Sequence, residues 1–168
     1  MRYTSIIACV LVAAALVAGG CSRQRTVVTP MGNATVTQKP GGGQTVEMNA
    51  GQGKVIVSTE KKTISEKELG VPVYPGAIVE VSGDYQGMAG SKGASIKQHM
   101  LTTPDDFDKV EAFYKANLKG AQNVMSQKMG DQSMAMFMTK APDGKQLMVH
   151  VIAKKGENGT KIQVMAGQ

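Results

Sequence analysis

Tryptophan is absent from the 168 residues, and only three phenylalanines and four tyrosines are present. A surface that stacks nucleic-acid bases needs aromatic side chains among basic ones. The lysines are dispersed along the chain, with no run of five basic residues. The formal net charge of +6 therefore indicates a solvated basic surface, and we expect no nucleic-acid partner.

Catalytic motifs are equally scarce. The only histidines are His99 and His150, and no serine stands in a G-x-S-x-G turn. The carboxylates within 105–108 stand where a helix is expected to begin and are explained by capping. The glycine-rich stretch 83–93 lacks the G-K-[ST] ending of a phosphate-binding loop. We therefore expect a protein that is not an enzyme and has no cofactor.

Cysteine occurs only twice, as Cys9 and Cys21. Cys21 closes an apolar run at 6–20 that ends in Ala-Gly-Gly, and Arg2 supplies a positive start. This arrangement resembles the signal of bacterial lipoproteins, in which the chain is cut before a cysteine that then carries lipid. The resemblance implies a signal peptide at residues 1–20.

Lipidation of Cys21 would place the protein in the bacterial cell envelope, with palmitate among its acyl chains. Several acyl chains anchor a protein firmly, since each buried CH₂ contributes about 0.8 kcal/mol. Ser22, in the place of an aspartate, favours the outer membrane facing the periplasm if the source has two membranes. Two alternatives stay open, an ordinary signal peptide cut elsewhere and an uncleaved anchor helix. The implied partners are the membrane and an envelope protein or peptide.

Composition divides the rest of the chain into three parts. Residues 21–44 are rich in Ser, Thr, Gln, Gly and Pro and predict a flexible tether with short β-prone runs. Residues 45–70 predict a β-hairpin and a short helical turn. Residues 71–168 predict a small folded domain.

The sequence of this domain predicts an α+β fold, in which one main helix packs on one face of an antiparallel sheet. Thr103 is the expected N-cap of the helix, followed by Pro104 at its first position. Alternation of apolar and polar residues, interrupted by turn sequences, predicts the strands. The expected order is β-β-α-β-β-β-β, with strands over 77–85, 94–101, 123–129, 133–139, 146–154 and 160–165.

Two short motifs of this domain are similar to a family pattern. The entry segment Val-Tyr-Pro-Gly-Ala at 73–77 and the helix motif Thr-Pro-Asp at 103–105, with Phe113-Tyr114 and Leu118, resemble uncharacterised bacterial secreted proteins and lipoproteins. The resemblance covers residues 70–168. It implies a small α+β module and brings no known activity with it.

Methionine is unusually frequent, with twelve residues in the chain. Met134, Met136 and Met138 share one face of an expected strand, and Met148 and His150 share a face of the next. Three interpretations follow: an irregular core under the helix, a groove for a peptide or lipid, and a periplasmic Cu(I) or Ag(I) site, since thioethers select soft ions. The expected function is a lipid-anchored, non-catalytic envelope protein that binds a partner or supports the envelope, with Cu(I) or Ag(I) binding as the alternative.

Overall fold

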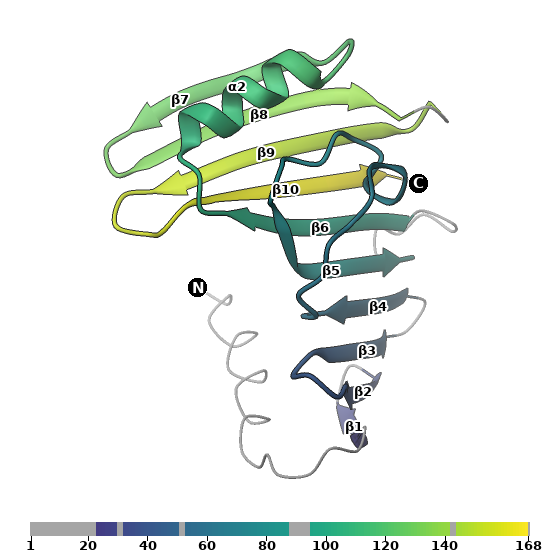
Figure 1. Cartoon of the computed structure of the whole chain (residues 1–168). Helices are drawn as coiled ribbons and strands as arrows, with labels where there is room; N and C mark the ends of the chain where they lie inside the picture. The colour runs from purple at the N-terminus through teal and green to yellow at the C-terminus, as the bar shows by residue number, and fades with distance from the viewer. Residues whose placement is uncertain (1–22, 30–31, 51–52, 88–94, 142–143, 168) are drawn as a thin grey trace, which may run out of the picture.

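The computed structural model describes residues 23–29, 32–50, 53–87, 95–141 and 144–167 (Figure 1). Ten strands form one antiparallel sheet in the order β1-β2-β3-β4-β5-β6-β10-β9-β8-β7. The elements are β1 Arg23–Thr29, β2 Gly32–Gln38, β3 Gln44–Ala50, β4 Gly53–Ser58, α1 Glu66–Leu69, β5 Ile78–Gln86, β6 Ser95–Thr103, α2 Phe107–Asn117, β7 Gln122–Met129, β8 Gln132–Lys140, β9 Gln146–Lys154 and β10 Thr160–Gly167.

The expected α+β fold is wrong, because the described residues are mostly antiparallel sheet, with helices of 4 and 11 residues. Strands β1 and β2 occupy most of residues 21–44, for which the sequence predicts a flexible tether. The Lys-Pro-Gly-Gly-Gly stretch is the turn between β2 and β3, closed by a hydrogen bond from the Lys39 amide to the Gly43 carbonyl at 2.8 Å. Gly41 and Gly42 have φ of 100° and 91°, which only glycine adopts readily.

The core lies on the face of the sheet that carries α2. This helix lies across β8 and β9 (Figure 1), and the Tyr114 and Phe137 ring centroids are 6.3 Å apart. The segment that runs from β4 to β5 covers the neighbouring part of this face with Leu69, Val71 and Tyr74. The most deeply buried core side chains are Val79, Leu101, Val110, Tyr114, Ala135, Phe137, Val149, Val151, Ile162 and Val164.

The helix begins three residues later than expected. Its N-cap is Asp106, whose Oδ1 accepts a hydrogen bond from the Lys109 amide at 3.0 Å. Thr103 is instead the buried last residue of β6. Asp105, just before the cap, accepts a hydrogen bond from the Tyr74 hydroxyl at 2.8 Å. This bond fixes the start of α2 against the segment before β5.

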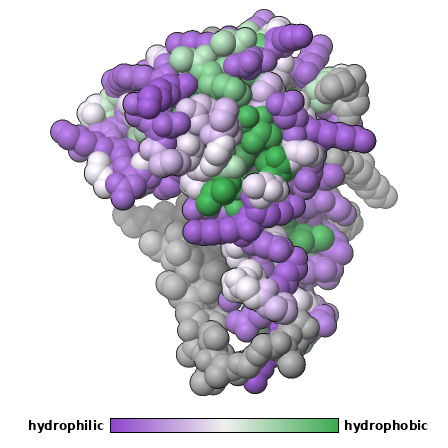
Figure 2. Space-filling view, in the orientation of Figure 1, coloured by the Kyte–Doolittle hydropathy of each residue, from purple (hydrophilic) through white to green (hydrophobic). Residues whose placement is uncertain are grey.

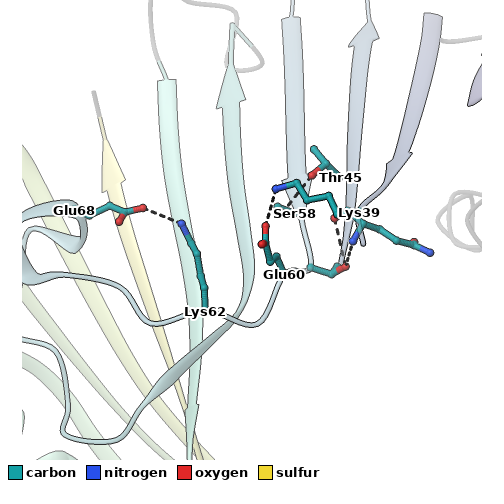
Figure 3. A network of polar contacts seen from close by, with 8 residues as sticks. Lys39, Thr45, Ser58, Glu60, Lys62 and Glu68 are labelled. Atoms are coloured by element: carbon teal, nitrogen blue, oxygen red, sulfur yellow. Dashed lines mark hydrogen bonds and ion pairs between the residues drawn. The ribbon is translucent and has the colours of Figure 1, made fainter. Parts of the chain in front are cut away.

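Exposed ion pairs and backbone hydrogen bonds connect the covering segment to its surroundings; Figure 3 shows the ion pairs. Lys39, in the β2–β3 turn, pairs with Glu60 at 2.6 Å, and Lys62 pairs with Glu68 at 3.1 Å. Lys62 also exchanges two backbone hydrogen bonds with Val79 of β5, at 3.2 and 2.8 Å. The segment is therefore tied to the N-terminal hairpin at one end and to the core at the other.

Candidate functional site: the uncovered face of the sheet

The two faces of the C-terminal strands have different surroundings. Side chains alternate between faces along a strand, and Phe137 packs against α2. Met136 and Met138, its immediate neighbours in the chain, therefore point away from the helix, as does Met134. These methionines do not fill the core under α2; each is partly exposed on the opposite face.

The same alternation holds in β9. Because apolar residues occupy both faces of this strand, its sequence predicts a strand covered on both sides. Leu147, Val149 and Val151 are buried under α2 and the covering segment, whereas Met148 and His150 are partly exposed on the other face. The strand is therefore covered on one side by the described part of the chain. The five candidate metal ligands share the uncovered side.

Strand register places methionines around His150. Met136 lies directly opposite His150 on β8, and Met125 of β7 lies opposite Met136. On the other side, Gln163 of β10 lies opposite His150. We call this cluster the methionine field; its members are Met100, Met125, Met134, Met136, Met138, Met148, Met165 and His150.

The sequence indicates some of these residues but not their grouping. Met165 was missed, because its position opposite Met148 depends on the pairing of β10 with β9. Met100 joins the field because β6 pairs with β10 and sets Met100 opposite Gln163. That pairing brings together strands separated in sequence by α2, β7, β8 and β9, and no local pattern predicts it.

His150 is the only ionisable member of the methionine field. Burial lowers the pKa of its imidazole, which favours the neutral form at pH 7. Its Nε2 atom is buried and has no hydrogen-bond partner among the described residues. Within the same part of the chain, no three His, Cys, Asp or Glu side chains converge on a metal position. Metal chemistry here would therefore depend on thioethers and one imidazole.

The uncovered face continues across the N-terminal strands as an apolar surface. Val36, Val46, Val57 and Gly83 form one cross-strand row, and Gly83 pairs with Gln98. Because cross-strand partners lie on the same face, this row is continuous with the methionine field, where Gln98 pairs with Met165. A second cross-strand row, two residues further along each strand, consists of Val27, Ala34, Met48, Val55 and Tyr85. We call the two rows together the valine field; its members are Val27, Ala34, Val36, Val46, Met48, Val55, Val57 and Tyr85.

Tyr85 lies across Gly83 within the valine field. A Cβ placed on Gly83 would come within 2.7 Å of the Tyr85 ring. Glycine in a strand interior weakens the strand unless another group approaches closely. Here the missing side chain makes room for the tyrosine ring, which adds apolar surface to the field.

The other face of the same strands is mostly polar, with Val28 and Ile56 among its apolar side chains. Thr35 and Thr37 alternate with Val36 along β2, and Glu47 follows Val46 along β3. The Glu47 carboxylate pairs with Lys54 at 2.7 Å on that side. Figure 2, which views the molecule from the α2 side, shows mostly hydrophilic and neutral residues with small separate hydrophobic patches. The extended apolar surface is therefore specific to one face.

The sheet face that carries the methionine field and the valine field is large. Strands lie about 4.8 Å apart, so ten strands extend over roughly 43 Å, and strands of this length measure about 20 Å or more. The largest apolar patch on an ordinary monomer covers about 300–600 Å², and larger patches mark interaction sites. The two fields occupy part of a face of roughly these dimensions, with Gln98 and Gln163 between them.

Two cations stand beside the valine field. Arg25 of β1 lies opposite Val36, and Arg23 lies opposite Gln38. Both arginine side chains are exposed and on the same face as the valines. The cross-strand row from Val36 to Gly83 contains no ionisable side chain. An uncharged apolar surface therefore ends at a cationic edge.

Other polar groups of the described residues do not form a catalytic arrangement. Ser82 Oγ lies 3.0 Å from His99 Nδ1, and burial lowers the pKa of His99. Neither residue lines the hollow of about 360 Å³ near the β9–β10 turn, which is bounded by Thr102, Ile152 and Lys161. The pair lacks a hydrogen-bonded carboxylate among the described residues, which a serine–histidine–acid triad requires.

Cys21 lies outside the described residues, so its lipidation stays a prediction. In the described ranges, neither helix has the length and apolar character needed to cross a bilayer. Comparisons with protein-family models, with curated proteins and with solved structures find no match for this chain.

Proposed function

We propose that this chain is a non-catalytic binding module of the bacterial cell envelope, attached to a membrane through lipid on Cys21. Its valine field binds the acyl chain of an anionic lipid. The observation that carries the proposal is the uncovered apolar face, with Arg23 and Arg25 at its edge.

The dimensions of the valine field fit an acyl chain. The row Val27, Ala34, Met48, Val55 and Tyr85 crosses five strands, or about 19 Å at the usual strand spacing. A lipid chain reaches across about half of a hydrocarbon core of roughly 30 Å. Each CH₂ group that the field removes from water contributes about 0.8 kcal/mol.

The arginines fit the other end of such a ligand. A guanidinium binds carboxylate or phosphate through two parallel hydrogen bonds, and Arg25 lies opposite Val36 at the end of an apolar row. A ligand with an apolar chain and an anionic head satisfies both parts of the surface. Attachment at Cys21 would keep the field beside membrane lipids.

A matched pair of substitutions on β2 tests the binding surface. Residues 22–168 retain every contact described above, so this form serves for titration with a fluorescent analogue of palmitic acid. We expect saturable binding that Val36→Asp weakens by at least about tenfold, equivalent to 1.4 kcal/mol or more. Thr37→Asp, on the polar face, leaves the affinity unchanged. Thermal unfolding checks that both variants are folded.

Three outcomes would contradict lipid binding. The wild-type protein fails to bind the probe, the two variants bind equally, or sedimentation shows a stable dimer whose formation Val36→Asp abolishes. The last outcome would assign the valine field to a second copy of the chain. Reversal of charge in Arg23→Glu with Arg25→Glu separates the headgroup contribution, because it weakens binding of the acid and spares binding of its neutral methyl ester.

Attachment to the membrane has its own test. In the bacterium that makes the protein, Cys21→Ala abolishes palmitate labelling and releases the protein from the membrane fraction. Unchanged labelling and fractionation would exclude lipidation at Cys21 while leaving the proposal for the valine field intact.

A further inference from the structure

We infer that the methionine field is a binding site for a soft monovalent cation, Cu(I) or its analogue Ag(I), centred on His150 and Met136. This site adjoins the valine field but shares no residue with it, and it stands or fails independently of lipid binding and of the anchor.

The register brings several thioethers within reach of one imidazole. Directly opposite residues of an antiparallel pair have Cβ atoms about 4.5–5.5 Å apart, and diagonal neighbours about 7–8 Å. Met136 is directly opposite His150, and Met134 and Met138 are its diagonal neighbours on β8. Met148, two residues before His150, lies on the same face of β9. Methionine has three rotatable bonds and adapts to such a centre.

The donor atoms define the class of cation. Thioether sulfur and neutral imidazole bind soft ions such as Cu(I), whereas carboxylate and carbonyl groups suit Mg²⁺, Ca²⁺ and Mn²⁺. The field has no carboxylate to neutralise a divalent ion, and a charge in an apolar setting is costly unless compensated. A monovalent soft ion therefore fits this face better than Cu(II) or Zn²⁺.

The state of His150 agrees with this assignment. Its Nε2 is buried without a hydrogen-bond partner among the described residues, and such a group carries a desolvation penalty until it gains one. Burial also lowers the imidazole pKa, so the ring is already in the neutral form that a metal requires. In the tautomer that carries its proton on Nδ1, Nε2 offers its lone pair to a cation at this position.

The test is titration of residues 22–168, which lack both cysteines and therefore any competing thiol. Ag(I) is added directly, and Cu(I) is added with ascorbate under nitrogen in competition with a chromogenic Cu(I) chelator. We expect one ion per chain with a dissociation constant below micromolar. Zn²⁺ added to the same protein does not compete for the site.

Conservative substitutions separate the site from general surface binding. Met136→Leu keeps the volume and removes the sulfur, and we expect it to weaken Ag(I) binding by at least about tenfold, or 1.4 kcal/mol. His150→Leu has an effect of the same size or larger. Met48→Leu, in the valine field, is the matched control and leaves the affinity unchanged.

Nuclear magnetic resonance of methionine methyl groups identifies the ligands without any substitution. Ag(I) shifts the methyl signals of Met136 and its neighbours Met134, Met138 and Met148, and leaves that of Met48 in place. The inference is overturned if no stoichiometric binding tighter than micromolar occurs, or if Met136→Leu and His150→Leu both bind as the wild type does.

Discussion

Met136 of β8 and His150 of β9 lie directly opposite each other on the face that α2 leaves uncovered. The residues that follow them, Phe137 and Val151, point to the opposite face and are buried. Each of these strands therefore divides its side chains between a core and a potential binding surface.

Substitutions at two adjacent positions of β8 should have unequal effects on stability. Phe137→Ala removes a ring with 1% exposure from the contact with Tyr114, and we expect a loss of about 3–5 kcal/mol in the free energy of unfolding. Met136→Ala, on the partly exposed face, should cost less than half as much. Urea denaturation measures both, and equal losses would show that the uncovered face is in fact a core.

Two glycines of the β9–β10 turn should differ in their tolerance of alanine. Gly156 and Gly159 both have positive φ, at 86° and 83°. A Cβ on Gly159 would come within 2.0 Å of the Thr103 carbonyl oxygen, whereas a Cβ on Gly156 meets nothing within 4 Å. Gly156→Ala should cost about 1–2 kcal/mol of backbone strain, and Gly159→Ala clearly more. A Gly159→Ala variant as stable as Gly156→Ala would refute the close packing of this turn against β6.

Asp106, rather than Thr103, should act as the cap of α2. Asp106→Ala removes the acceptor for the Lys109 amide and should lower the free energy of unfolding by about 1 kcal/mol. Asp106→Asn, which retains a side-chain acceptor, should recover most of that loss. Helix content by circular dichroism and urea denaturation give the comparison. An Asp106→Ala protein with the free energy of unfolding of the wild type would show that Asp106 is not the N-cap of α2.

Alkaline pH should destabilise the fold through Tyr74. Burial, together with the hydrogen bond to Asp105, raises the pKa of Tyr74 to about 12, against about 10 in an unfolded chain. A pKa raised by folding gives stability that is complete below pH 10 and is lost as the pH rises through about 12. Thermal midpoints should fall across this window and fall less in Tyr74→Phe.

A second tyrosine limits how far the wild type and Tyr74→Phe differ at alkaline pH. Burial also raises the pKa of Tyr114, and Tyr114 is present in both proteins. The hydrogen bond from Tyr74 to Asp105 also makes stability depend on pH in the acid range, through the carboxyl group of Asp105. The bond from Tyr74, followed by Lys109, lowers the pKa of Asp105, so its stabilising contribution is lost as the pH falls below the usual carboxyl range. An identical pH profile for the wild type and Tyr74→Phe would contradict both statements.

Local patterns predict individual elements of this fold better than its class. Alternation along Lys161 to Val164 indicates a half-exposed strand, and β10 lies there with Ile162 and Val164 buried. The predicted fold class differs from the observed one mainly at the N-terminus, where polar, glycine-containing sequence is typical of a tether. Threonine and valine alternate in Thr35-Val36-Thr37, and this short pattern extends the sheet because a neighbouring strand is available for pairing.

The candidate site could be predicted only in part for a related reason. Spacing of two residues places Met134, Met136 and Met138 on one face of a strand, but it does not say which face meets the helix. That choice depends on Ala135 and Phe137 packing under α2, a contact between distant parts of the chain. The valine field depends on the register of five strands and has no signature in any one of them.

Because the chain contains no tryptophan, the fluorescence of one introduced tryptophan reports lipid binding at a chosen position. A single tryptophan introduced by V46W in the valine field, or by T45W on the polar face, reports contact with a fatty acid that carries a nitroxide quencher. We expect strong, saturable quenching in V46W and little in T45W, with both proteins folded. Equal quenching in the two variants, or none in V46W, would contradict binding at the uncovered face.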